Sequence, residues 1–196
     1  PDLAKLYGPP YSSPNILTLS TVCDDHLIDE ATREPHTAIW QHRLGRGQGQ
    51  ESLRFVEYMA ADSPVYVRSY VCGEPGVRWV IRPNEAAQVM PAHGLPGSWL
   101  LVQPPGQRIL FYLSTRWFYH WIIPTGGCQM ERTADGELAA RCLPGTGGLA
   151  IVGASEYPLG LLCAERVASQ GADDLLPAAR RFWEEAHRRR IWRMGP

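Results

Sequence analysis

The chain has 196 residues, of which 44% are hydrophobic and 20% are charged, and its formal net charge is −1. A chain of this length can bury one good-sized core. Its near-neutral charge gives no reason to expect nucleic acid or an anionic membrane as a partner. No apolar run reaches the roughly 18 residues of a membrane-spanning helix. Glycine (19 residues) and proline (17) are frequent, which favours many short strands and turns over a helical bundle.

The first fifty residues divide into three segments. Residues 1–14 contain three prolines and are predicted to form an extended lead-in. Residues 15–22 place apolar side chains among serines and threonines, which predicts a strand. Residues 23–51 are polar and end in a stretch rich in glycine and glutamine, which predicts a long loop.

The clearest strand signal lies between residues 52 and 82. Apolar and polar side chains alternate in residues 52–59 and 77–82, which indicates strands with one buried face, and residues 65–72 carry apolar side chains at both parities, which indicates a strand with both faces partly covered. Short Gly/Pro-containing segments with good turn chemistry separate them. We therefore expect three consecutive strands that pair as an antiparallel meander.

More strand candidates follow at shorter intervals. Turn signals separate them every 8–12 residues or so, which is typical of a β-sandwich or β-barrel. The candidates are residues 98–102, 108–113, 118–123, 129–132, 138–142 and 149–152. Residues 159–169 fit either a last strand or a helix.

One amphipathic helix is expected at residues 172–190. Its apolar side chains fall on a single stripe at helical spacing, and they are Leu175, Leu176, Ala179, Phe182, Trp183 and Ala186. The predicted fold is mainly β: a two-sheet antiparallel β-sandwich of the super-sandwich type with one C-terminal amphipathic helix. The predicted organisation is a lead-in (1–14), a sandwich (15–172), and a helix with a linker toward a further domain (173–196).

Five cysteines are scattered along the chain without a C-x-x-C pair, namely Cys23, Cys72, Cys128, Cys142 and Cys163. An odd number of isolated cysteines argues against a disulfide framework and a zinc knuckle. Free thiols in a reducing compartment predict a cytoplasmic location, although secretion with one disulfide stays open. No phosphate-binding or dinucleotide fingerprint is present, so no cofactor is expected.

Polar clusters in the sequence give no catalytic or metal motif. His26, His36 and His42 lie among acidic residues, but their spacing matches no compact metal site, which favours a polar loop. Carboxylates for acid–base hydrolysis are present, yet no spacing selects a pair; the candidates are Glu57, Asp62, Glu74 and Glu85. The arginines near the C-terminus are interpreted as a solvated helix face and linker.

Two stretches resemble a known family. Residues 55–59 (FVEYM), 67–73 (VRSYVCG) and 81–83 (IRP) follow a strand–turn–strand pattern, "V-x-D-F-M-P", "L-V-R-x-V-x-G" and "R-P-R". Residues 179–192 (ARRFWEEAHRRRIW) are similar to a closing helix, "T-x-x-F-W-x-x-W". Both patterns resemble the N-terminal β-sandwich domain of inverting α-glycoside hydrolases, the family of bacterial glucoamylases, glucodextranases and bacterial trehalases.

The resemblance implies that a catalytic (α/α)6 barrel follows this chain in a parent glycoside hydrolase acting on α-glucosides. The family's general acid and general base lie in that barrel, so no catalytic residue is expected here and the chain alone is not expected to be an enzyme. Its implied role is a non-catalytic accessory domain that braces the barrel. Phe182, Trp183 and Trp192 are the expected inter-domain contacts, and the barrel is the expected partner.

A different function is indicated by the aromatic run at residues 117–121. On a strand, Trp117, Tyr119 and Trp121 would share one face, and exposed aromatic rings form a platform for sugars. The alternative is therefore a self-standing carbohydrate-binding module for an α-glucan or oligosaccharide. The same pattern also fits a core strand or a domain interface, and His120 is interpreted as a structural histidine. A small independent enzyme or a secreted immune-type binding sandwich is a third hypothesis.

Overall fold

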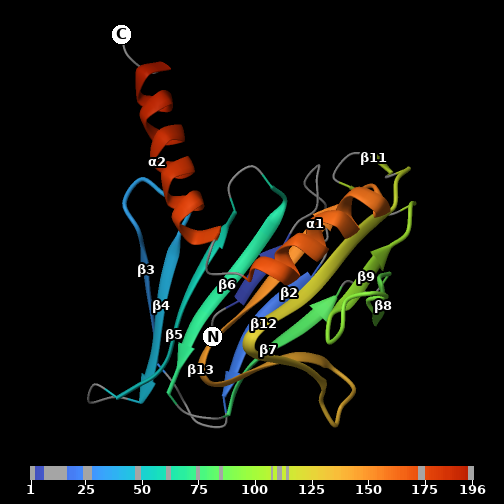
Figure 1. Cartoon of the computed structure of the whole chain (residues 1–196), viewed down its shortest axis with the longest axis horizontal. Helices are drawn as coiled ribbons and strands as arrows, with labels where there is room; N and C mark the ends of the chain where they lie inside the picture. The colour runs from blue at the N-terminus through green and yellow to red at the C-terminus, as the bar shows by residue number, and fades with distance from the viewer. Residues whose placement is uncertain are drawn as a thin grey trace.

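The computed structural model confirms that the protein is mainly β (Figure 1). The structure describes residues 3–6, 17–23, 28–46, 50–60, 63–73, 76–83, 86–106, 108–109, 112–113, 115–171 and 175–193. The N-terminal strands are β1 (Leu3–Leu6), β2 (Leu17–Cys23), β3 (Ile28–Arg33), β4 (Trp40–Arg46), β5 (Gln50–Met59), β6 (Val65–Cys72) and β7 (Val77–Pro83). They are followed by β8 (Gln88–Pro91), β9 (Trp99–Gln103), β10 (Arg108–Ile109), β11 (Tyr112–Leu113), β12 (Phe118–Arg132) and β13 (Leu138–Ala154). The helices are α1 (Tyr157–Gln170) and α2 (Leu175–Arg193).

Eleven of these strands form one antiparallel sheet that folds over on itself. The order along its main path is β1-β2-β7-β13-β6-β5-β4-β3, and β12, β9 and β8 extend it beyond β13. Residues 138–141 of β13 pair with β7, whereas residues 145–152 pair with β6. The folded sheet thus has two leaves, one that contains β7 and one that contains β6. The long β12–β13 hairpin passes from one leaf to the other.

The bend in this hairpin depends on glycine. Gly126 has φ +58 and Gly145 has φ +110, backbone conformations that side chains rarely tolerate. Gly147 leaves room for a neighbour, because a Cβ on it would lie 2.7 Å from Oη of Tyr70. The hairpin can thus bend at the point where Tyr70 crosses it.

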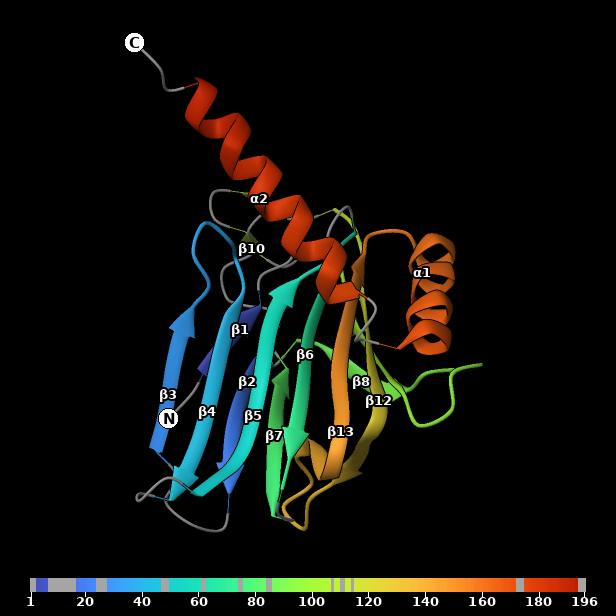
Figure 2. The same cartoon turned by 60° about the vertical axis from the view of Figure 1, so that its left-hand side comes forward.

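The two leaves pack face to face around aromatic side chains. Phe55 on β5 and Tyr70 on β6 each lie with ring centroids 5.6 Å from the fully buried Trp79 on β7. The strands β6 and β7 are not hydrogen-bonded to one another, so these are contacts between layers. Figure 2 shows β2 and β7 behind β5 and β6. The space between the two leaves holds the main hydrophobic core, as in a β-sandwich.

A second hydrophobic core lies beneath α1 and α2, on the outer face of the leaf that contains β6. Trp121 on β12 is fully buried there, together with Ala164 of α1 and Ala179 of α2. Gly160 of α1 lies so close to the Trp121 ring that a Cβ would collide with it. A residue without a side chain is therefore required where α1 crosses the sheet.

Several expectations are corrected by this arrangement. Residues 23–51 were expected to be a loop, but residues 28–46 contain the β3–β4 hairpin. Its inner face carries Asp29 and His42 in place of apolar side chains, so the alternation that marks a strand is missing. The predicted meander is correct for β5 and β6 and wrong for β7, which pairs with β2 and β13.

The helix content is also higher than expected. Residues 159–169 belong to α1, which begins with a proline in its first turn and ends at Gly171 with φ +78. The predicted C-terminal helix is confirmed as α2. Within the lead-in, the described residues Leu3–Leu6 form a strand that pairs with β2. No helix among the residues that the structure describes is long and apolar enough to cross a membrane.

Candidate functional site

The aromatic strand proposed as a sugar platform lies largely beneath α1. Trp117 is 45% exposed, Tyr119 is half-buried and Trp121 is fully buried. Tyr157 of α1 covers the last two, with ring centroids 5.3 Å from Tyr119 and 5.4 Å from Trp121. The structure therefore does not present the three rings together as an open surface. The segment that covers them is the one whose sequence fitted both strand and helix.

The aromatic residues expected at a domain interface lie on α2. Phe182 and Trp183 are both partly buried, and their rings meet edge to face with centroids 5.1 Å apart. The indole of Trp183 donates a 3.4 Å hydrogen bond to the carbonyl of Met59 on β5. Trp183 thus contacts the sandwich of its own chain. The side chain of Trp192 lies outside the described part of the structure.

Residues 180–187 of α2 are fixed to the turn between β3 and β4. Arg180 donates to both carboxylate oxygens of Glu34, at 2.6 and 3.1 Å, and Gln41 donates to Oε1 of the same group at 2.8 Å. The hydrogen bonds from Arg180 lower the pKa of Glu34 and outweigh the effect of its burial. Two turns further along α2, His187 stacks on His36 with centroids 4.0 Å apart. Sequence analysis missed these contacts because residues 28–46 looked like a loop.

The end of α2 that follows His187 projects beyond the sandwich. Figure 2 shows the helix rising away from the ends of β5 and β6. Arg188 and Arg189 are strongly exposed, and both pair with Glu185 of the same helix. The described part of α2 thus combines a segment anchored at residues 180–187 with a solvent-facing end.

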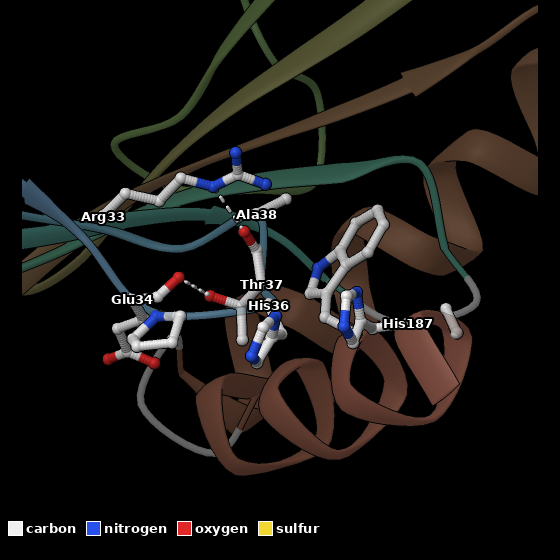
Figure 3. A pocket seen from close by; sticks show the side chains of 9 residues that line it. Arg33, Glu34, His36, Thr37, Ala38 and His187 are labelled. Atoms are coloured by element: carbon white, nitrogen blue, oxygen red, sulfur yellow. Dashed lines mark hydrogen bonds between the residues drawn. The ribbon is translucent and has the colours of Figure 1, made fainter. Parts of the chain in front are cut away.

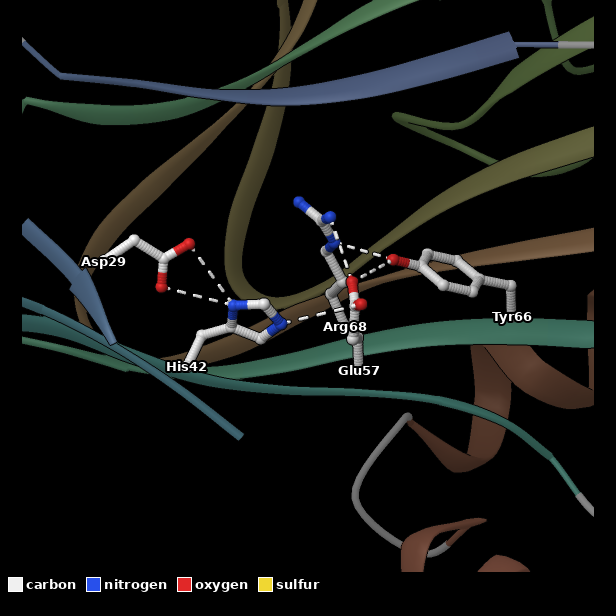
Figure 4. Close-up of polar contacts among 5 residues, drawn as sticks. All are labelled: Asp29, His42, Glu57, Tyr66 and Arg68. Carbon is white, nitrogen blue, oxygen red and sulfur yellow. Dashed lines mark hydrogen bonds and ion pairs between the residues drawn. The ribbon is translucent and has the colours of Figure 1, made fainter. Parts of the chain in front are cut away.

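A second polar cluster lies inside the sandwich at the strands β3 to β6 (Figure 4). Glu57 on β5 lies directly opposite Arg68 on β6 and accepts hydrogen bonds from Arg68 at 3.0 Å and from Tyr66 at 2.8 Å. Arg68 also donates to the Tyr66 hydroxyl at 2.7 Å. His42 faces Glu57 through Nε2 at 3.5 Å and Asp29 through Nδ1 at 3.3 Å. Two acidic and two basic side chains thus meet in one buried row.

The electrostatics of this row fix the protonation state of Glu57. Burial would raise its pKa, but the hydrogen bond with His42 and the charge of Arg68 hold that pKa at about 2. Burial raises the pKa of Tyr66 well above its ordinary value. Arg68 is completely buried and lies over the rings of Phe55 and Trp79, 5.0 and 5.5 Å from their centroids. A permanently ionised, fully engaged Glu57 cannot serve as a general acid near neutral pH.

His42 links the two carboxylates of the row. Carboxylates only accept hydrogen bonds, so an imidazole with one carboxylate at each ring nitrogen is best satisfied when both nitrogens carry protons. The ring stacks on Phe55 at 4.3 Å, with an interplanar angle of 4°. The balance of charges among Asp29, His42, Glu57 and Arg68 suits a structural network that joins four strands.

The other residues considered as nucleophiles or metal ligands are also unsuited to these roles. Cys72, Cys128 and Cys142 are buried, and burial raises the pKa of Cys128 to about 12, so its reactive thiolate is disfavoured. Cys163 is a partly exposed free thiol, and the side chain of Cys23 is outside the described set. No group of three or more potential ligands that could hold a metal ion occurs among the described residues. His26, Asp62, Glu74 and Glu85 lie outside those residues.

The comparisons with known proteins give no family. No protein-family model matches the chain. No curated protein matches it either.

Proposed function

We propose that this chain is a non-catalytic accessory domain that braces a separate catalytic domain. The observation that carries the proposal is the form of α2. Its residues 180–187 are held on the sandwich by Glu34, Met59 and His36, and the end of the helix beyond His187 projects into solvent (Figure 2). A helix anchored in this way can hold a following domain at a fixed distance and direction.

The hydrogen bonds made by three acidic side chains support a non-catalytic role. Glu57 is bound by Tyr66 and Arg68 and faces His42, and Asp29 is bound to the other nitrogen of His42. Glu34 is bound by Arg180 and Gln41. A glycosidase needs one carboxyl group that holds a proton and one that activates water or attacks the sugar, and these groups are committed to internal partners.

The nature of the catalytic domain is proposed from the resemblance. The strand and helix patterns at residues 55–83 and 179–192 are similar to those of inverting α-glycoside hydrolases. The proposed partner is therefore an (α/α)6 barrel of the same parent chain, acting on α-glucosides. Phe182 and Trp192 remain proposed contacts with it, together with the part of Trp183 that the sandwich leaves uncovered.

The alternative, a self-standing carbohydrate-binding module, has less support. Of its three proposed rings only Trp117 is well exposed, and Trp121 is fully buried. Sugar-binding platforms work through ring faces that the ligand can reach. Tyr119 contributes at most a partly covered ring, because Tyr157 packs against it.

The test uses charge reversal on the projecting end of α2. Arg188→Glu and Arg189→Glu are compared in the isolated chain and in the natural polypeptide that contains it. In the isolated chain the variants are expected to unfold at the wild-type temperature within about 2 °C, because both side chains are exposed. In the natural polypeptide they are expected to shorten the half-life of glucosidase activity on heating, since they would face the catalytic domain.

A matched control places the same change elsewhere. Arg141→Glu alters an exposed arginine on β13, far along the chain from α2. It is expected to leave the half-life of the natural polypeptide unchanged. Equal effects of all three variants in that polypeptide would contradict a bracing role for α2.

A further inference from the structure

A cleft of about 450 Å³ lies between α2 and the turn that joins β3 to β4 (Figure 3). It is separate from the buried row around Glu57 and from the projecting end of α2. Its lining combines basic, imidazole and apolar side chains. The residues that face it include Arg33, His36, Thr37, Trp183, Ala186 and His187.

The turn holds its side chains in a defined arrangement. Nε of Arg33 donates to the carbonyl of Thr37 at 2.7 Å, and Oγ1 of Thr37 donates to the carbonyl of Glu34 at 3.1 Å. His36 has φ +57, a left-handed conformation that is uncommon for a residue with a side chain. In this conformation its ring lies against His187 of α2. The two imidazoles thus form one wall that bridges the turn and the helix.

The acidic residue of the cleft is already neutralised. Glu34 borders the cleft, but its carboxylate accepts hydrogen bonds from Arg180 and Gln41. Figure 3 shows this carboxylate turned away from the two imidazoles. An ion pair cancels most of the field that a single carboxylate would exert on an incoming anion.

The groups that remain are hydrogen-bond donors beside an apolar wall. Only Nε of Arg33 is engaged within the described part of the chain, so both Nη groups remain to donate. The indole N–H of Trp183 is committed to Met59, which leaves its ring, with Ala38 and Ala186, as apolar surface at the cleft. Guanidinium donors are well suited to carboxylate and phosphate, which accept two parallel hydrogen bonds.

We propose that this cleft binds a small organic oxyanion, a carboxylate or phosphate carried on a ring-sized body. The Nη groups of Arg33 and an N–H of the His36–His187 pair bind the oxyanion, and Trp183 with Ala186 contacts the body. The volume of the cleft is at the small end of the range for ligand pockets, roughly 300–1,000 Å³. The proposal is independent of the bracing function.

The test measures binding of simple probes to the whole chain. Benzoate, its neutral analogue benzamide, and inorganic phosphate are titrated while the indole N–H signal of Trp183 and the histidine ring signals are followed by NMR. We expect saturable shifts with benzoate and at least about tenfold weaker binding of benzamide, because hydrogen bonds to a charged group contribute more than those to a neutral one. Benzoate binding more tightly than phosphate indicates an organic carboxylate, and the reverse order indicates a phosphate ligand.

Variants show whether the named residues bind the probe. Arg33→Gln is expected to weaken the binding of whichever anion, benzoate or phosphate, binds the wild type more tightly, by about tenfold or more. His187→Phe keeps a ring at the stacking position, removes its N–H groups, and is expected to weaken binding by a smaller factor. His93→Ala, on an exposed turn between β8 and β9, is the matched control and should leave the affinity unchanged.

Three results would overturn the proposal. The first is equal binding of benzoate and benzamide. The second is the absence of a shift at the Trp183 indole with either anion at about 10 mM, a concentration that saturates sites with millimolar dissociation constants. The third is an unchanged affinity in Arg33→Gln, provided that the variant keeps the wild-type unfolding temperature.

Discussion

Arg180 on α2 donates two hydrogen bonds, of 2.6 and 3.1 Å, to the carboxylate of Glu34, a residue 146 positions earlier in the chain. This pair joins the C-terminal helix to the turn between β3 and β4. It therefore fixes the direction in which α2 leaves the sandwich. Both the proposed bracing role and the cleft beside His36 depend on that direction.

Removing the charge of Glu34 is expected to loosen α2. Glu34→Gln keeps the shape of the side chain but weakens both hydrogen bonds, so the free energy of unfolding should fall by about 1 kcal/mol, in the range of partly exposed ion pairs. Because the pKa of Glu34 is lowered in the fold, this contribution is present above its unfolded pKa and is lost as the pH falls through the folded value. Hydrogen exchange of the α2 amides at neutral pH gives the measurement, and unchanged protection would contradict the contact.

A larger effect is expected from the buried row. Arg68→Leu leaves the partly buried Glu57 with His42 but without its arginine, and breaking a buried pair costs up to about 3–5 kcal/mol. The double variant Arg68→Leu with Glu57→Leu should recover part of this loss, because no uncompensated charge remains. Urea unfolding of the two single variants and the double variant measures the coupling, and strictly additive losses would contradict it.

The same row predicts a pH dependence at acid pH. The pKa of Glu57 is about 2 in the fold, compared with 4.5 for the free group. The stability that Glu57 provides is therefore complete above about pH 4.5 and is lost as the pH falls toward 2. Glu57→Gln should flatten the stability curve between these values, and a curve identical to the wild type would contradict the assignment.

The buried imidazole of His120 predicts a second pH range in which the stability of the fold changes. Its imidazole is buried on β12, its Nδ1 has no hydrogen-bond partner among the described residues, and burial lowers its pKa to about 4 from 6.5. The unfolded chain then binds the proton first, so stability is full above about pH 6.5 and falls as the pH drops toward 4. The loss is roughly 3 kcal/mol at most. An NMR titration showing His120 ionised at pH 6 would contradict this reading, and His120→Phe should remove the slope in that window.

Gly160 is expected to reject even a methyl group. Gly→Ala in a helix is ordinarily stabilising by roughly 0.5–1 kcal/mol, but here a Cβ would meet the Trp121 ring and lie 2.7 Å from Cβ of Ala154. Gly160→Ala should therefore lower the free energy of unfolding by about 1–3 kcal/mol. Leu159→Ala, at the neighbouring and exposed position, should change it by less than about 0.5 kcal/mol. A thermal melt of both variants distinguishes the positions.

The contrast between these two residues explains why α1 was not identified from sequence. The helix buries Gly160, Ala164 and Val167 and exposes Leu159 and Leu162. Two of its three leucines thus lie on the outer side, and the residues that it buries completely are smaller ones. A search for an apolar stripe follows the leucines and gives an ambiguous result.

The strands were predictable to different extents for a similar reason. Much of β5 and β7 alternates apolar inner residues with more polar outer ones, and β6 is rich in β-formers and buried on both faces, so their sequences indicate strands directly. β3 and β4 carry Asp29 and His42 on the inner face, because that face holds the charged row. Alternation then fails as a signal where the interior is polar.

The candidate site was also predictable only in part. Glu57 and Arg68 lie on consecutive strands joined by a short turn, and correct register alone brings them together. The pairs Glu34–Arg180 and His36–His187 connect distant parts of the chain. Nothing in the local pattern of either segment specifies such a partner, so these contacts required the three-dimensional structure.

The measurement that tests the central claim most directly is glucose release from maltose, trehalose and a soluble α-glucan, assayed with the purified chain and with the natural polypeptide that contains it. We expect release by the natural polypeptide and none by the chain alone, because Asp29, Glu34 and Glu57 are bound to partners within the chain. Release by the chain itself that is abolished in Glu57→Gln would contradict the account, and so would a natural polypeptide that cleaves none of the three.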